Sequence, residues 1–230
     1  MDIGATLFLI GFLVVFGFLL YPAIQSSRKE KEGRQHTTQS LGFTRVNGNA
    51  ELTNKIARLY NRAGSQNRYE LRNVSSKALP DGTMYLFDLV DTSGDDDSWT
   101  ERQAVAVVSP YLKLPHFAFF PKADQKYALS GLANRIVEWG MTKIGTPLAF
   151  PEFPAFNERY VVTSIEPDLA RGFLDDRIAQ FFSRTQMYMV HAMSDIFTFA
   201  EMDPRFDTTD LNSMSQRINR TMDIYRVLQK

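Results

Sequence analysis

The stretch that decides the fold is "RYELRNVSSKALPDGTMYLFDLVDT", residues 68–92, which places two extended segments on either side of one turn. The turn, Pro80–Gly82, has the composition of a β-turn, because proline fixes φ and glycine tolerates positive φ. In the second segment the alternate residues from Tyr85 to Leu89 are all apolar, whereas the intervening set contains Asp88. Alternate residues of a strand point to opposite faces. The stretch therefore predicts a β-hairpin with one buried face.

Two further strands are predicted directly after this hairpin. They read "RQAVAVVS" (residues 102–109) and "HFAFFP" (residues 116–121). The connections between them are the acidic loop "TSGDDDS" and the segment "PYLKLP". Because short connections join neighbouring antiparallel strands, the four strands predict an antiparallel meander.

Helical spacing flanks this strand region. Residues 49–64 predict an amphipathic helix with Asn49 as N-cap and Gly64 as its end, and with Leu52, Ile56, Leu59 and Tyr60 on one face. Further helices are predicted in residues 126–140 and 167–185. A strand is predicted in residues 157–167, and a hairpin in residues 186–202.

The last predicted element is an amphipathic helix. Thr208, Thr209 or Asp210 can cap it, and its apolar stripe consists of Leu211, Met214, Ile218, Tyr225 and Leu228. We therefore expect an α+β fold in which residues 41–230 form one domain, with a mainly antiparallel sheet packed by helices. By analogy, a curled sheet closed by the C-terminal helix, as in a pleckstrin-homology barrel, is one version of this fold.

Residues 1–26 are predicted to be a transmembrane anchor. The run Ile3–Ile24 contains no charged residue and, as a helix rising about 1.5 Å per residue, would span about 33 Å. The membrane-spanning residues include Ile3, Leu7, Gly11, Val15, Phe18 and Tyr21. A cleaved signal peptide is the main alternative, but a basic n-region and a good cleavage site are missing. Gly4, Gly11 and Gly17 do not form a GxxxG motif, so they give only a weak indication of helix contact.

The basic residues near the anchor predict its orientation. Arg28, Lys29, Lys31 and Arg34 follow the apolar run, and no lysine or arginine precedes it. The positive-inside rule then places the N-terminus outside and the C-terminal domain in the cytoplasm. Residues 27–40 are predicted to be a polar linker or a solvated extension of the anchor helix.

Composition excludes several classes of function. Lysine and arginine total 26, as do aspartate and glutamate, so no basic excess indicates nucleic-acid binding. The chain has no cysteine, which excludes disulfides, thiolate nucleophiles and cysteine-based metal sites. His36, His116 and His191 do not have the spacing of a zinc site. We also find no phosphate-binding glycine loop and no serine-nucleophile motif, and we expect no cofactor, no bound metal and no catalytic residue.

One acidic cluster leaves an enzymatic alternative open. Asp91, Asp95, Asp96 and Asp97 offer oxygen ligands to a divalent cation, although their spacing is not that of an EF-hand. A metal-assisted, membrane-bound hydrolase would use this Asp91–Asp97 loop. The favoured interpretation is a solvated hairpin tip whose charges discourage aggregation.

Phenylalanines gather among prolines in residues 114–156. Phe117, Phe119, Phe120, Phe153 and Phe156 are candidates for a partner surface, because aromatic residues on proline-stiffened loops suit contact with a protein or a lipid interface. The alternative that we favour is that they plug one end of the sheet. A lipid- or peptide-binding sensor would require an apolar pocket lined by this cluster.

The segment "FPEFPAFNERYVV…EPDLARGF" resembles bacterial single-pass membrane proteins of an uncharacterised family. The resemblance rests on Phe156, Tyr160, Val162, Asp168, Ala170 and Arg171 and covers about residues 110–180. It implies a bacterial inner-membrane location and no particular reaction. We therefore expect a membrane-tethered, non-catalytic interaction domain, an accessory or structural subunit of a larger complex, with the bilayer and other membrane proteins as partners.

Overall fold

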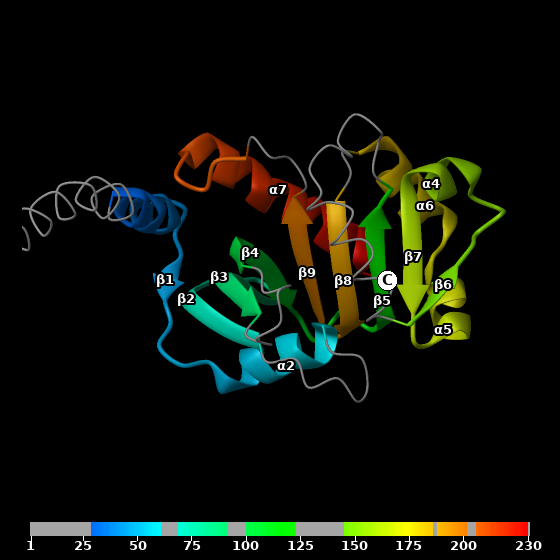
Figure 1. Cartoon of the computed structure of the whole chain (residues 1–230), viewed down its shortest axis with the longest axis horizontal. Coiled ribbons are helices and arrows are strands. Elements are labelled where there is room, and N and C mark those ends of the chain that lie inside the picture. Colours follow the sequence, from blue (N-terminus) through cyan, green and yellow to red (C-terminus); the bar gives the residue numbers. More distant parts are fainter. Residues whose placement is uncertain are drawn as a thin grey trace, which may run out of the picture.

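The computed structural model describes residues 29–60, 69–91, 100–122, 145–185, 188–201 and 206–229. Within them the chain has an α+β fold built on a nine-stranded sheet in the order β1-β2-β3-β4-β9-β8-β5-β7-β6 (Figure 1). The strands are β1 (Thr44–Arg45), β2 (Tyr69–Leu79), β3 (Gly82–Asp91), β4 (Thr100–Val108), β5 (Leu114–Pro121), β6 (Thr146–Leu148), β7 (Tyr160–Ser164), β8 (Tyr188–Ser194) and β9 (Ile196–Glu201). Every pairing in this sheet is antiparallel.

The predicted meander is correct for β2, β3 and β4 but wrong for β5. The β8–β9 hairpin lies between β4 and β5, and Ser109 N donates to Asp195 O where β4 ends. Crossing from β4 to β5 covers three strand spacings, about 14 Å at about 4.8 Å each. The connection from Val108 to Leu114 reaches about 20 Å when extended. The short connection from β4 to β5 is therefore long enough to pass the two strands of the inserted β8–β9 hairpin.

Helices cover both faces of the sheet. They are residues 29–40, α2 (Ala50–Tyr60), α4 (Pro154–Arg159), α5 (Pro167–Phe173), α6 (Asp176–Arg184) and α7 (Leu211–Leu228). Within the described residues the sheet is open, with β1 and β6 at its edges, and it does not close into the barrel of the pleckstrin-homology analogy.

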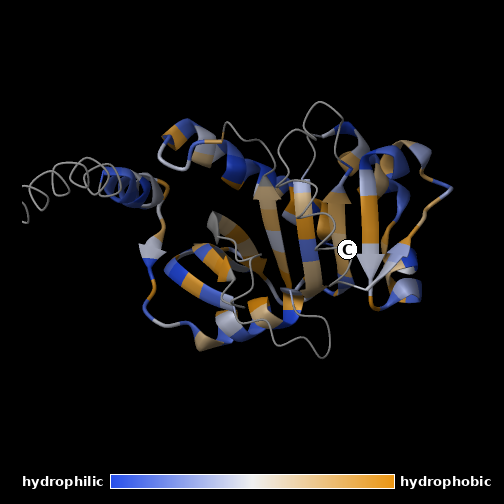
Figure 2. Ribbon diagram, in the orientation of Figure 1, coloured by the Kyte–Doolittle hydropathy of each residue, from blue (hydrophilic) through white to orange (hydrophobic). Residues whose placement is uncertain are grey.

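The sheet is apolar on both faces, not on one. The larger cluster, the main core, contains Met84, Leu86 and the buried apolar residues of α6 and α7. The smaller cluster, the α2 core, contains Phe87, Leu89 and the buried residues of α2. Figure 2 shows apolar residues along the central strands, whereas the helix of residues 29–40 is hydrophilic.

The predicted caps explain where the helices begin. Asn49 Oδ1 accepts a hydrogen bond from Leu52 N at 2.9 Å, as expected for the N-cap of α2. The helix predicted over residues 167–185 is two helices, because Asp175 leaves helical geometry and its side chain caps Ile178 N at the start of α6.

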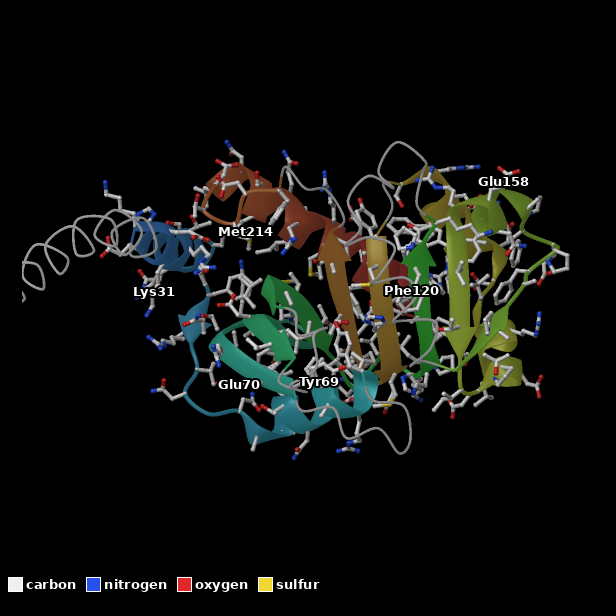
Figure 3. The ribbon with its side chains drawn as sticks, viewed as in Figure 1. Lys31, Tyr69, Glu70, Phe120, Glu158 and Met214 are labelled. Atoms are coloured by element: carbon white, nitrogen blue, oxygen red, sulfur yellow. The ribbon has the colours of Figure 1, made fainter. Side chains whose placement is uncertain are left out.

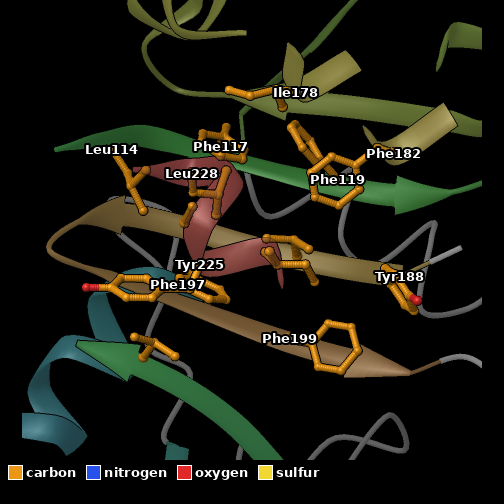
Figure 4. Packing of buried hydrophobic residues seen from close by; sticks show 14 of the residues in the cluster. Leu114, Phe117, Phe119, Ile178, Phe182, Tyr188, Phe197, Phe199, Tyr225 and Leu228 are labelled. Atoms are coloured by element: carbon orange, nitrogen blue, oxygen red, sulfur yellow. The ribbon is translucent and has the colours of Figure 1, made fainter. Parts of the chain in front are cut away.

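The C-terminal helix is confirmed, with Asp210 as its N-cap. Met214, Tyr225 and Leu228 are buried, as the stripe predicted, but Leu211 is 45% exposed and Ile224 is buried as well. Figure 4 shows Tyr225 and Leu228 beside the sheet residues of the main core, among them Phe197 and Phe117. Tyr225 also donates its hydroxyl to Ser109 Oγ at 2.7 Å.

The segment predicted as a polar linker is helical over residues 29–40 and packs against the domain through its last turns. Thr37 Oγ1 donates to Thr209 O at 2.7 Å, just before α7. A Cβ atom at Gly33 would lie 3.4 Å from Thr209 Cβ, so the two backbones approach closely. No helix within the described ranges is long and apolar enough to cross a bilayer, and Ile3–Ile24 falls outside them.

Candidate functional site

The phenylalanine cluster lies in the core. Phe117, Phe119, Phe120 and Phe156 are each at most 1% exposed, and Phe153 is partly buried against the main core. The ring of Phe119 meets the rings of Phe156 and Phe182 edge-on, with centroids 5.4 and 5.0 Å away. The four buried side chains are therefore not a partner surface.

The other predicted regions lie outside the described residues. These are the membrane-spanning residues Ile3, Leu7, Gly11, Val15, Phe18 and Tyr21, the acidic residues Asp95, Asp96 and Asp97, and the helix predicted in residues 126–140. Among the residues that the structure does describe, no three or more His, Asp or Glu side chains converge on a possible metal position.

Two of the three histidines are buried beneath α2. His116 Nε2 lies 3.1 Å from Leu59 O, and since a carbonyl oxygen only accepts, Nε2 carries the proton. Burial lowers the pKa of His116, and it lowers that of His191 to about 3. Both rings are therefore neutral near pH 7. His116 is the structural hydrogen-bonder that its position in a strand predicted.

Ser164 and Glu166 join His116 in a set of residue types that resembles a nucleophilic triad. Ser164 Oγ donates to His116 O at 2.7 Å, and Glu166 Oε2 accepts from His116 N at 2.8 Å. Both contacts are made to the backbone of His116, whereas its ring is directed to Leu59 O. The imidazole is not placed to activate Ser164, so the set connects β5 to the β7–α5 corner and does not form a catalytic dyad.

A small pocket lies where the helix of residues 29–40 meets the sheet edge. Its volume is about 80 Å³. It is lined mainly by polar and basic side chains, namely Lys31, Arg34, Gln35, Thr38, Gln39, Arg45, Asn73, Ser75 and Asp88, together with the rings and methyls of Phe43 and Leu86. We call it the N-terminal pocket. Figure 3 shows Lys31 at the end of the molecule opposite to Glu158.

The floor of the N-terminal pocket is shaped by a β-bulge. The register of β2 on β3 shifts between Arg72 and Ser75, and Asn73 there has a φ of 52°. Asparagine tolerates this left-handed conformation better than most residues. The bulge lets Asn73 Nδ2 donate to Asp88 Oδ2 at 2.6 Å, which holds the buried Asp88 carboxylate in place.

Arg34 forms part of the opposite wall. Its side chain is 15% exposed, and its Nη1 is 3.7 Å from Glu30 Oε1, one turn earlier on the same helix. Nη1 is buried and has no hydrogen-bond acceptor in the described part of the chain. A buried donor without an acceptor costs about 1–3 kcal/mol, and the ion pair with Glu30 compensates part of the charge of this guanidinium.

Only indirect signals in the sequence point to this pocket. Asp88 interrupts an otherwise apolar strand, and Asn73 interrupts the alternation of β2. Arg34 and Lys31 are distinguished in the sequence only by their charge. Their contact with β1–β3 depends on how the helix packs, which local periodicity does not reveal.

The comparisons with known proteins add no relative. The chain matches no protein-family model, no curated protein and no solved structure.

Proposed function

We propose that this chain is a membrane-tethered, non-catalytic interaction domain that works as an accessory subunit beside other membrane proteins. The anchor is Ile3–Ile24, the N-terminus faces outward, and the sheet domain lies in the cytoplasm at the inner membrane of a bacterium. The long uncharged run and the four basic residues after it support the anchor and its orientation.

The observation that carries the proposal is the packing of residues 29–40 on the domain. The helix reaches Thr209 through Thr37, and its next residues join β1: Phe43 N donates to Thr38 O at 3.1 Å. Packing of this kind fixes the direction in which residues 29–40 leave the domain. A flexible linker would set only the distance.

The described histidines of the sheet and Ser164 are engaged in packing and in backbone hydrogen bonds. His116 and His191 are buried and neutral, and the groups around Ser164 bind backbone atoms. General acid–base or nucleophilic catalysis requires such side chains to face a substrate.

The test is affinity purification of tagged full-length chain after gentle detergent extraction. In one variant an unrelated spanning helix replaces Ile3–Ile24, and in another the run is deleted. Partner recovery should survive the replacement and be lost on deletion. Full partner binding and function from the deleted form would contradict the tethering proposal.

A matched pair of point variants tests the packing of the helix. T37V removes the hydroxyl that bonds Thr209 O, whereas T44V changes an exposed threonine of β1. We expect T37V to reduce partner recovery and T44V to leave it unchanged. Equal recovery from both variants would mean that tethering alone, without a set orientation, is sufficient.

A further inference from the structure

We propose that the N-terminal pocket binds a phosphate group, and that its position favours the headgroup of an anionic phospholipid as the source. The proposal deepens the function given above, because the lipid source rests on the chain being anchored at a bilayer. The phosphate chemistry itself rests only on the pocket.

The first argument is charge. Lys31 and Arg34 come from the helix, Arg45 comes from β1, and Asp88 is the one acidic side chain of the lining. Asp88 is also tied down by Asn73, at 2.6 Å. When Glu30, which forms an ion pair with Arg34 at 3.7 Å, is counted with the lining, the site carries one more positive than negative charge. Side chains from three separate chain segments build this site together.

The second argument is hydrogen-bonding capacity. Arg34 Nη1 is buried without an acceptor in the described residues, and the carboxylate nearest to it is beyond hydrogen-bond distance, at 3.7 Å. A guanidinium binds phosphate oxygens with paired N–H donors, and an arginine is suited to this geometry. Gln35 and Gln39 add neutral amide donors to the same wall.

The third argument is size and place. About 10–15 Å³ of such space admits one water molecule, so a pocket of about 80 Å³ has room for a small polyatomic anion. It lies at the helix of residues 29–40, which follows directly on the predicted membrane exit. Basic groups close to the cytoplasmic leaflet attract anionic lipids.

The lipid arm of the test uses full-length chain in nanodiscs that contain equal parts phosphatidylcholine and phosphatidylglycerol. Native mass spectrometry measures how much phosphatidylglycerol stays bound to the released protein. R34Q and R45Q should each lower this retention by roughly threefold to tenfold, the effect of losing one partly exposed charge contact. R226Q is the matched control, because Arg226 lies on α7, exposed and paired with Asp223. It should retain phosphatidylglycerol like the wild type.

The soluble arm titrates glycerol 3-phosphate into the same proteins in non-ionic detergent, followed by calorimetry. R34Q also alters the charge next to the anchor, so R45Q, which does not, keeps the test valid if R34Q inserts poorly. Glycerol 3-phosphate binding that R45Q weakens, together with phosphatidylglycerol retention that R45Q leaves unchanged, would support the phosphate site. It would assign the site to a soluble phosphoester and not to a lipid.

Equal lipid retention and equal titration curves for wild type, R45Q and R226Q would overturn the proposal. The titration with glycerol 3-phosphate does not require a membrane. If only the anchor assignment is wrong, this titration still detects binding, whereas if the phosphate site is wrong, it does not.

Discussion

The ring of His191 stands edge-on to the ring of Tyr60, with centroids 4.6 Å apart and planes 75° apart. The contact joins the centre of β8 to the last residue of α2. Phe120 approaches the same imidazole, at 5.3 Å. The Tyr60 hydroxyl lies 3.0 Å from Thr198 Oγ1, on the strand next to His191. A histidine thus serves as an apolar, aromatic member of the layer beneath α2.

This burial predicts acid sensitivity. Burial lowers the pKa of His191 from 6.5 to about 3, so between these values the unfolded chain binds a proton that the folded chain does not. The stability from neutral His191 is complete above pH 6.5 and is lost as the pH falls toward 3. At pH 5 the loss is about 2 kcal/mol.

The measurement is the free energy of unfolding in denaturant, from pH 7 to pH 4.5, for full-length chain in non-ionic detergent. H191Q should flatten this dependence. T163V is the control: it changes a buried residue on the same face without removing a titrating group, so it should keep the wild-type slope. An unchanged slope in H191Q would show that His191 is not the group responsible.

How far the sequence predicts the fold depends on the range of the interactions. The β2–β3 hairpin and the α2 cap follow from residues close in the chain, namely the Pro80–Gly82 turn and Asn49. The position of β5 depends on the β8–β9 hairpin, which is formed about 80 residues later. Alternation identifies a strand but not its partner, so the short connection after β4 predicts a pairing with β5 that the sheet does not contain.

The candidate site was predicted less well, for a similar reason. A phenylalanine among prolines has the same composition in a core as at an interface, so only packing distinguishes the two for Phe119. The N-terminal pocket needs the bulge that turns Asn73 toward Asp88 and the docking of Arg34 above them. Neither leaves a periodic signal in the sequence.

The core assignment of the phenylalanine cluster predicts a large stability effect. F119A removes a ring that contacts several others, and such a truncation costs about 3–5 kcal/mol. Y111A, at a residue that is 65% exposed, should cost less than about 1 kcal/mol. Denaturant midpoints measure both. A small loss in F119A would revive the idea of an exposed aromatic face.

Two glycines predict opposite results for the same substitution. Gly145 has a φ of +80°, and a Cβ atom there would lie 2.2 Å from Ser164 O, so G145A should destabilise the β6–β7 corner. Gly172 lies within α5 with open space around it, so G172A should raise stability by about 0.5–1 kcal/mol. The midpoint of thermal unfolding measures both effects. If G172A lowered this midpoint and G145A did not, the close approach of Gly145 to Ser164 would be contradicted.

The acidic loop predicts the absence of a tight calcium site. D95N, D96N and D97N together should leave folding nearly unchanged, because the loop composition suits a solvated hairpin tip. Calorimetric titration of the full chain with Ca²⁺ should detect no binding tighter than about millimolar, the range of the weakest protein sites. A micromolar site that the triple variant loses would instead support the metal-assisted hydrolase.

The orientation of the anchor gives the last prediction. A reporter that is active only in the cytoplasm should be active when it is fused after Lys230. The reason is that the apolar run is followed by Arg28, Lys29, Lys31 and Arg34 and that no basic residue precedes it. Moving the four basic residues ahead of Ile3 should favour the inverted orientation. Exchanging them for other basic residues in place, arginine for lysine and lysine for arginine, is the control and should leave orientation unchanged. Activity of a strictly periplasmic reporter on the unmodified chain would reverse the assignment, and it would move the N-terminal pocket to the outer leaflet.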